Sequence, residues 1–374
     1  MSKVGIESCQ QYEKEQVLDA VRALLDKLGG MEQFVRRGDR VVVKPNLILK
    51  RQPGGAATTH PYVVRAVCLL AMEAGGIVTI AESPGGVYNP NLLKGLYQTC
   101  GMTEIAQELG VKLNFDVTSR NVSFPEGKAV KGFELITPIL EADVVLSVSK
   151  LKTHVMSYMT GAVKNLFGCV PGTYKAEYHF RMPDKKTFCN MLVDLCEYIK
   201  PTLSIMDAVE CMEGDGPTSG SPRYGGYLLA SSDPYALDVV ACRLANLEME
   251  PVYILQNAQE RGLLDIQNIE ELGKYTPIED FRRPGMKDIH FLKNPMLKRL
   301  AEKLVNPRPA ADTKKCIGCG QCAQNCPAEA IEMKEKLPHI DFSRCIKCFC
   351  CHELCPIKAM QLKRNRLWSA ILHI

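Results

Sequence analysis

The sequence predicts two unlike parts: an α/β domain with a mostly parallel sheet and helices on both faces, and then a small cysteine-rich α+β module. Strand-like and helix-like stretches alternate through the larger part. Of the 17 cysteines, eight are spread over residues 1–315 and nine fall in residues 316–374. We therefore expect the α/β domain over residues 1–305, an extended linker over residues 306–315, and the cysteine-rich module over residues 316–374.

The composition is that of a soluble globular protein. Hydrophobic residues make up 46% and charged residues 24%, and a formal net charge of +4 is too small to indicate nucleic-acid binding. The N-terminus lacks the features of an export signal, and no apolar run approaches the roughly 18 residues of a membrane span. We therefore expect a cytoplasmic protein without an integral membrane segment, whose thiols bind metal and do not form disulfides.

Four apolar stretches predict strands that each end in polar residues. They cover residues 40–43, 76–81, 143–148 and 203–206, and amphipathic helices are expected over residues 13–28 and from Pro61 to Gly75. Because the carboxyl ends of parallel strands meet at one edge of a sheet, ligands of such sheets bind there. The sequence therefore predicts one crevice shared by four strand ends.

Cationic and amide side chains dominate this expected crevice and indicate a small anionic substrate. The expected anion-binding residues are Lys44, Asn46, Ser83, Gly85, Gly86, Lys150, Lys164 and Asn165. His154, Lys152 and Asp207 are the candidates for catalytic roles, and Glu82, Asp215, His60 and His179 are further acid–base or metal-binding candidates. The alternative is that the lysines are merely solvated, the glycine pair is a plain turn and the histidines cap helices.

The cysteine-rich module contains an internal repeat. Residues 316–327 and 345–356 both have C-x2-C-x2-C-x3-C-P spacing, 29 residues apart. Three thiolates at this spacing can surround one face of an iron–sulfur cube, and backbone N–H groups between them point at its sulfurs. Zinc is the main alternative, but a zinc ribbon would leave the third cysteine and the C-P of each run without a role.

The spacing predicts two [4Fe-4S] clusters with crossed ligation, in which the fourth cysteine of each run binds the cluster of the other run. We assign Cys316, Cys319, Cys322 and Cys355 to cluster 1, and Cys345, Cys348, Cys351 and Cys326 to cluster 2. Cys350 is then a spare thiol. His339 and His352 are expected to be solvent-exposed, because each cluster already has four thiolates.

These residues resemble a bacterial two-cluster ferredoxin over residues 316–362, and the resemblance implies transfer of single electrons at low potential. The larger part resembles a second family, the prokaryotic domain of unknown function numbered 362. That resemblance rests on the strings Lys44-Pro-Asn46, Ser83-Pro-Gly-Gly86, Lys150-Leu-Lys-Thr-His154, Ala162-Val-Lys-Asn-Leu166 and Glu213-Gly-Asp-Gly-Pro217. Members are often joined to a ferredoxin module, and membership implies no particular reaction.

Other features carry less functional weight. No dinucleotide-binding, P-loop, nucleophile-elbow or H-E-x-x-H motif occurs. The eight scattered cysteines are expected in the core, and Cys169 is the one whose reactivity merits a test. Apolar spacing predicts a bridging helix over residues 292–304, and the end of the chain, residues 364–374, is expected to dock on the α/β domain, with peripheral membrane binding as the alternative.

Two functions fit the sequence. In the first, the clusters exchange electrons with a small anionic substrate in the crevice, so that the protein is an oxidoreductase. In the second, the α/β domain only binds or docks, and the protein is an electron carrier for a redox partner protein. A third and weaker hypothesis makes the clusters purely structural.

Overall fold

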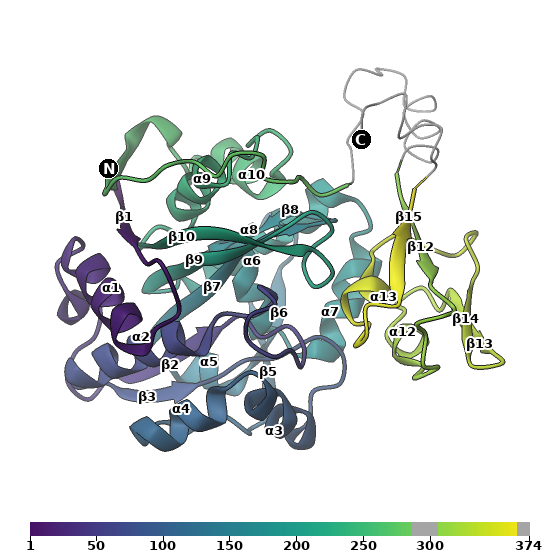
Figure 1. Ribbon diagram of the computed structural model, residues 1–374, viewed down its shortest axis with the longest axis horizontal. Helices are drawn as coiled ribbons and strands as arrows, with labels where there is room; N and C mark the ends of the chain where they lie inside the picture. The colour runs from purple at the N-terminus through teal and green to yellow at the C-terminus, as the bar shows by residue number, and fades with distance from the viewer. Residues whose placement is uncertain (286–305, 365–374) are drawn as a thin grey trace.

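The computed structural model describes residues 1–285 and 306–364, and its larger part is built around one nine-stranded sheet (Figure 1). Five of its strands, in the order β9-β7-β2-β3-β4, run parallel. The full order is β11 (Ile269–Leu272), β1 (Ser2–Ser8), β10 (Ser221–Ser231), β9 (Leu203–Glu213), β7 (Val144–His154), β2 (Arg40–Pro45), β3 (Ile77–Ile80) and β4 (Lys112–Leu113), with β8 (Tyr158–Thr160) paired to β7. The predicted α/β class with a mostly parallel sheet is confirmed.

Helices cover both faces of this sheet, because successive strand residues point to opposite sides. Val41 and Val43 pack in one core, under α1 (Lys14–Asp26), α2 (Pro61–Glu73), α3 (Pro90–Thr99) and α4 (Met102–Leu109). Val42 packs in the other core, with α5 (Thr137–Glu141), α6 (Ala162–Asn165), α8 (Lys185–Ile199), α9 (Pro234–Leu244) and α10 (Tyr253–Glu260). β5 (Ser119–Ser123) and β6 (Gly132–Ile136) form a separate hairpin, and 3-10 turns cover Met31–Gln33, Leu166–Cys169 and Ile266–Asn268.

The four predicted strand ends do meet at one edge, since β3, β2, β7 and β9 are consecutive neighbours. β7 and β9 extend further than expected, to His154 and Glu213. At this edge α7 (Gly172–Arg181) lies beside the small module (Figure 1).

The small module is built from two copies of one unit, 29 residues apart. Each unit has a strand, a cysteine loop, a short helix and a second strand: β12 (Arg308–Ala311), α12 (Gln321–Gln324) and β13 (Ile331–Lys334), then β14 (Leu337–Ile340), α13 (Cys350–Glu353) and β15 (Met360–Lys363). Left-handed residues recur at the same offset, with Gly318 and Gly320 matched by Lys347 and Phe349. The structural repeat is therefore longer than the cysteine pattern alone.

The two copies are interleaved, because β12 pairs with β15 and β13 with β14. This corrects the expected linker over residues 306–315: residues 308–311 form β12, an integral strand of the module. An isolated stretch with two prolines gives no strand signal of its own, and β12 is stabilised by pairing with a strand about 50 residues later. The predicted helix over residues 292–304 lies outside the described residues, as does the tail after Arg364.

The small module packs against the strand-end edge of the sheet. Arg51 donates to the carbonyl oxygens of Pro356 (2.6 Å) and Cys355 (3.1 Å), and the Thr218 hydroxyl donates to the Glu353 carbonyl (3.0 Å). In the part of the chain that the structure describes, no helix is long and apolar enough to cross a membrane.

Candidate functional site

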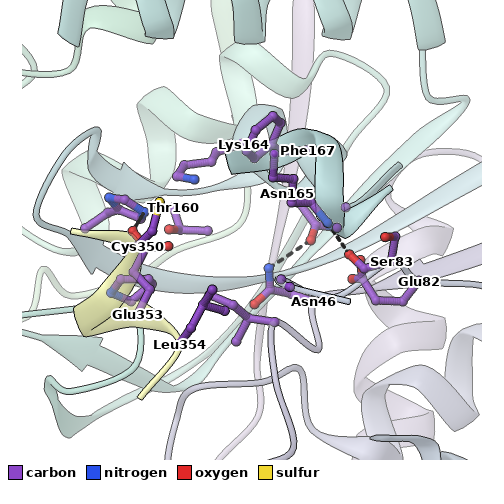
Figure 2. Close-up of a pocket in the computed structure, with 18 of the residues that line it drawn as sticks. Asn46, Glu82, Ser83, Thr160, Lys164, Asn165, Phe167, Cys350, Glu353 and Leu354 are labelled. Carbon is purple, nitrogen blue, oxygen red and sulfur yellow. Dashed lines mark hydrogen bonds and ion pairs between the residues drawn. The ribbon is translucent and has the colours of Figure 1, made fainter. Parts of the chain in front are cut away.

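A cavity lies where the two modules meet, and Figure 2 shows side chains that line it. The α/β domain contributes residues from the ends of β2 and β7, the loop after β3, and α6 and α7. The small module contributes Asn325 and three residues from α13 and the position after it, Cys350, Glu353 and Leu354. Of the sequence-predicted candidates, it gathers Lys44, Asn46, Ser83, Gly85, Gly86, Lys152, His154, Lys164 and Asn165.

The floor of the cavity is a buried polar network around Lys44. Its ammonium donates to Glu82 Oε2 (2.7 Å), to Asn165 Oδ1 (3.1 Å) and to the carbonyl of Pro45 (2.7 Å). A lysine has three N–H donors, so Lys44 is fully occupied by the protein. A side chain at Gly168 would place its Cβ 2.1 Å from Glu82 Oε1, so only glycine lets this loop close over the ion pair. Lys44 therefore organises the site and has no N–H group left for a ligand.

Three other lysines face the cavity with less complete pairing. Lys152 donates to Asn46 Oδ1 (2.6 Å) and the Ala57 carbonyl (2.7 Å), and burial lowers its pKa to about 7. Lys175 donates to the carbonyl oxygens of Ser83 and Pro84, and burial lowers its pKa to about 7 as well. Lys164 lies over the rings of Phe167 (5.4 Å) and Phe188 (5.8 Å) and donates no hydrogen bond to any described residue. Lys164 is therefore the cation most available to a ligand.

Five buried polar atoms in the lining have no hydrogen-bond partner among the described residues. They are Ser83 Oγ, Thr160 Oγ1, His154 Nε2, His179 Nδ1 and Glu353 Oε1. Buried polar groups are nearly always hydrogen-bonded, so these atoms are available to pair with a polar ligand or with water. Figure 2 shows Thr160 and Glu353 on one side of the cavity and Ser83 on the other, with Asn46 and Asn165 between them.

His154 presents an N–H group to Glu353. Its Nδ1 accepts hydrogen bonds from the backbone N–H groups of Met156 (3.0 Å) and Ser157 (3.2 Å), so the proton of the neutral ring lies on Nε2. That Nε2 lies 3.1 Å from Glu353 Oε1, but the two are not aligned for a hydrogen bond. Burial lowers the pKa of His154 to about 4, and that of His179 to about 3, so both rings are neutral near pH 7.

The structure separates Lys150 and Asp207 from this cavity. They pair with each other at 2.9 Å, and Tyr12 bonds to both of them. The β7–β9 ladder is irregular at this point, so that Lys150 lies opposite Asp207 whereas Lys152 lies opposite Met212. Asp207 also accepts from the backbone N–H of His60, whose own Nδ1 caps α2, so the expectation of crevice roles for these residues is corrected.

Sequence reasoning missed Lys175, Cys350 and Glu353 as parts of this cavity. Lys175 lies one turn into α7 and not at a strand end, so the strand-end pattern did not include it. The weak sequence signal for it was its position three residues after Gly172, on the helix that follows Val170-Pro171. Cys350 and Glu353 lie inside the second cysteine run, so only the packing of the two modules shows their role. His352, expected to be exposed, is 1% exposed because α13 packs against the larger domain, whereas His339 is exposed as expected.

The scattered cysteines are core residues, as expected. All eight are buried, and burial raises the pKa of Cys169 to about 12, which excludes a reactive thiolate at that position near neutral pH.

The four cysteines assigned to cluster 1, Cys316, Cys319, Cys322 and Cys355, line a second cavity and come from both runs. Among the described residues, no three His, Cys, Asp or Glu side chains are grouped closely enough to hold a single metal ion. The Cys355 sulfur accepts from the backbone N–H of Ala359 (3.1 Å), and the Cys326 sulfur accepts from Ala330 (3.3 Å), at equivalent positions of the two copies. Such N–H···S contacts are those that a thiolate ligand of a cluster uses.

Comparisons with known proteins recover both modules. A model of the domain of unknown function DUF362 matches residues 41–243, more than half of the chain, and a 4Fe-4S dicluster domain matches residues 315–359. The chain is 38% identical over 264 residues to the thylakoid-associated protein sll1697 of Synechocystis sp., covering 70% of this chain and 79% of the relative.

Among solved structures, the lactate racemase apoprotein of Thermoanaerobacterium thermosaccharolyticum aligns with a TM-score of 0.38 and 11% identity. The alignment covers 65% of this chain and 56% of the racemase, a little over half of its length.

Proposed function

Because this chain belongs to the DUF362 family and carries a 4Fe-4S dicluster domain, we propose that it is an electron-transfer oxidoreductase that binds a small anion between its two modules. One observation carries the proposal: the wall opposite the sheet edge is α13, which lies between the ligand candidates Cys348 and Cys355 and includes Cys351. The cavity is lined by Cys350, the sequence neighbour of the cluster 2 candidate Cys351, so a ligand there lies on the side of α13 that carries Cys350.

The charge of the lining supports an anionic ligand. Lys44, Lys152, Lys164 and Lys175 face two carboxylates, Glu82 and Glu353. Glu82 is neutralised by Lys44 at 2.7 Å, so the remaining lysines outnumber Glu353. Burying cations without anions is unfavourable, and an anion that enters the cavity relieves that cost.

The two sets of assigned cluster cysteines differ in solvent exposure. This difference suits a protein that carries electrons between a partner in solvent and a buried ligand. Cys319 is exposed, whereas Cys348 and Cys351 are buried. Two [4Fe-4S] clusters, when bound, would supply or accept electrons one at a time. The chain itself would hold the anion with Lys164 and Lys175 and exclude water by closing α13 over the sheet edge.

A cytoplasmic location is part of the proposal, because thiolate ligands persist in a reducing compartment. A redox partner protein is the proposed source of electrons, and the relative sll1697 is described as thylakoid-associated.

Reoxidation of the pre-reduced protein tests the proposal. We expect that at least one small oxo acid reoxidises the dithionite-reduced holoprotein, at a rate that saturates with its concentration, because its carbonyl takes up two electrons from the clusters and two protons to become a hydroxyl. Phosphate and alkanoates, which cannot accept these electrons, serve as controls for binding alone. Lys164→Met should keep the iron content and slow this reaction about ten-fold or more, because it removes a lining cation that donates no hydrogen bond to any described residue. Anaerobic stopped-flow absorbance measures both. If no anion changes the reoxidation rate, the electron-carrier alternative is favoured instead.

Anion binding should weaken as the pH rises through 7. In the free protein, burial lowers the pKa of Lys175 to about 7. The positive charges of Lys44 and Lys164 also lower this pKa, and the negative charge of Glu82 acts in the opposite direction. A bound anion favours the charged amine, so binding takes up a proton, and affinity should fall about ten-fold between pH 6 and pH 8 for each such lysine. Calorimetry in buffers of different ionisation enthalpy measures the proton uptake.

Lys131 offers a matched control, because it also donates to two backbone carbonyls but lies on the β5–β6 hairpin. Lys175→Met should reduce the proton uptake, and Lys131→Met should leave it unchanged. Proton uptake that is equal in both variants would contradict the role of Lys175.

A further inference from the structure

One arginine of the larger domain contacts the backbone of an assigned cluster ligand. Arg51 lies in the loop between β2 and α2, and its guanidinium donates to the carbonyl oxygens of Pro356 (2.6 Å) and Cys355 (3.1 Å). The N–H groups of a guanidinium lie in one rigid plane, so two of them fix both the position and the orientation of the acceptors. Arg51 therefore holds the carbonyl group of Cys355 and that of the residue after it.

The loop that carries Arg51 is fixed to the sheet edge. The Asn46 backbone N–H donates to Thr59 Oγ1 (3.0 Å), and the Thr59 N–H donates to the Asn46 carbonyl (2.9 Å), which closes the base of the loop. Within the loop, the Ile48 carbonyl accepts from the Gly85 N–H (3.0 Å). The hydrogen bonds of Arg51 therefore tie Cys355 to an anchored part of the larger domain.

The equivalent cysteine of the other copy has no such contact. Cys326 and Cys355 lie 29 residues apart, and each sulfur accepts from the backbone N–H four residues later, that of Ala330 (3.3 Å) or Ala359 (3.1 Å). Of the two cysteines, only Cys355 also accepts a hydrogen bond from the larger domain among the described residues. The internal repeat therefore does not account for the Arg51 contact, which is specific to the cysteines assigned to cluster 1.

Arg51 is not the only cation beside Cys355. Lys358 lies close enough for its charge to interact with that of Arg51. Its backbone N–H donates to the Cys355 carbonyl (3.3 Å), but in the described part of the chain its ammonium donates to neither carbonyl that Arg51 contacts. An arginine keeps its charge at every pH at which proteins are studied, so the Arg51 contact involves no titration. Comparing the two residues therefore separates the effect of a nearby positive charge from that of the two hydrogen bonds.

We propose that Arg51 is a positioning residue for cluster 1. Its two hydrogen bonds hold the Cys355 backbone where the thiolate completes the ligand set, so the larger domain sets how readily this cluster is reduced and how firmly its iron is held. Groups that orient a metal ligand tune potential and affinity in this way, and their loss typically costs ten-fold to a hundred-fold in affinity. The inference rests on the proposed function only in taking cluster 1 as an electron carrier, and it requires no ligand in the cavity between the modules.

Arg51→Met in full-length, anaerobically purified holoprotein tests the proposal. The equilibrium constant for one-electron reduction of cluster 1 should fall about ten-fold, which corresponds to about 59 mV, because the variant removes donors beside a ligand of a group that gains negative charge. About four of the roughly eight irons should be lost to a chelator about ten-fold faster. Redox titration followed by paramagnetic resonance measures the first effect, and Cys345→Ser, which lacks a ligand assigned to cluster 2, supplies the reference signal of cluster 1.

Three matched variants make the result specific. Thr218→Val removes another hydrogen bond between the modules, to the carbonyl of Glu353, and Lys358→Met removes the neighbouring cation. Both should leave the reduction of cluster 1 within about three-fold of the natural protein. Arg51→Lys keeps the charge but loses the paired planar N–H groups, so it should still lower the equilibrium constant about three-fold or more.

The possible failures are distinguishable. An Arg51→Met protein that keeps the natural reduction equilibrium and iron retention overturns the inference and leaves the proposed function intact. An equal effect of Thr218→Val would show general loosening of the two modules, and an equal effect of Lys358→Met would show charge alone, so either result also overturns it. If dithionite reduces neither cluster of the natural protein, the electron-transfer function fails, whereas faster iron loss from Arg51→Met alone would still support the positioning role.

Discussion

Replacing Cys355 with serine should halve the iron content of the protein, from about eight to about four atoms per chain. Cys355 lines one cavity with Cys316, Cys319 and Cys322, although these three cysteines precede it by 30 to 40 residues in the sequence. The assigned cysteines nearest to Cys355 in the sequence belong to the other set. Loss of one thiolate from a closed set of four should cost that cluster and spare the other. Iron and acid-labile sulfide analysis of anaerobic protein measures the effect.

Paramagnetic resonance of the reduced variants identifies which cluster is lost. Cys355→Ser and Cys316→Ser should retain the same signal, and Cys345→Ser and Cys326→Ser should share a different one. Cys350→Ser is the matched control: Cys350 is a neighbouring buried thiol outside the assigned sets, and its variant should keep about eight irons. If Cys355→Ser retains the signal of Cys345→Ser instead, the crossed assignment is wrong.

Neutralising Glu82 should destabilise the larger domain by about 3–5 kcal/mol, because it leaves the Lys44 charge buried without its partner. The two side chains are 0% and 3% exposed and 2.7 Å apart. Glu82→Gln keeps the size of the side chain, so the effect is one of charge. The free energy of unfolding, from urea denaturation followed by circular dichroism, measures it.

Two comparisons make the Glu82 result specific. Lys186→Met breaks an exposed ion pair with Glu260 and should cost less than about 1 kcal/mol. The double variant Lys44→Met/Glu82→Gln removes both buried charges and should recover much of the stability lost in Glu82→Gln. A loss in Glu82→Gln no larger than that in Lys186→Met would show that the pair is not the organising feature of the floor.

The strand-end edge of the larger domain was predictable from sequence because each buried strand is an apolar run that stops at polar residues. This local signal placed Lys44, Asn46 and Ser83 at one edge, and all three line the same cavity. It failed for Lys150, because the ladder irregularity between Lys150 and Lys152 depends on how β7 meets β9 and leaves no trace in either strand alone.

Features that depend on packing between distant segments were not predictable. β12 is a strand only because β15 lies beside it, and Arg308-Pro-Ala-Ala311 has no periodicity that indicates one. Glu353 and His352 lie in a cysteine run whose spacing concerns metal binding, so the pattern says nothing about the face of α13 that meets the larger domain. The burial of His352 follows from the docking of the two modules.

The position of α13 has a thermodynamic consequence. This single turn includes Cys351, a predicted cluster ligand, and also Glu353, a wall of the cavity. If iron insertion orders this turn, it also completes the wall and so strengthens anion binding. Coupling between two binding sites is reciprocal, so a bound anion must then strengthen iron binding by the same factor. Apoprotein should therefore be a poor receptor, and the ligand should slow the release of iron to a chelator.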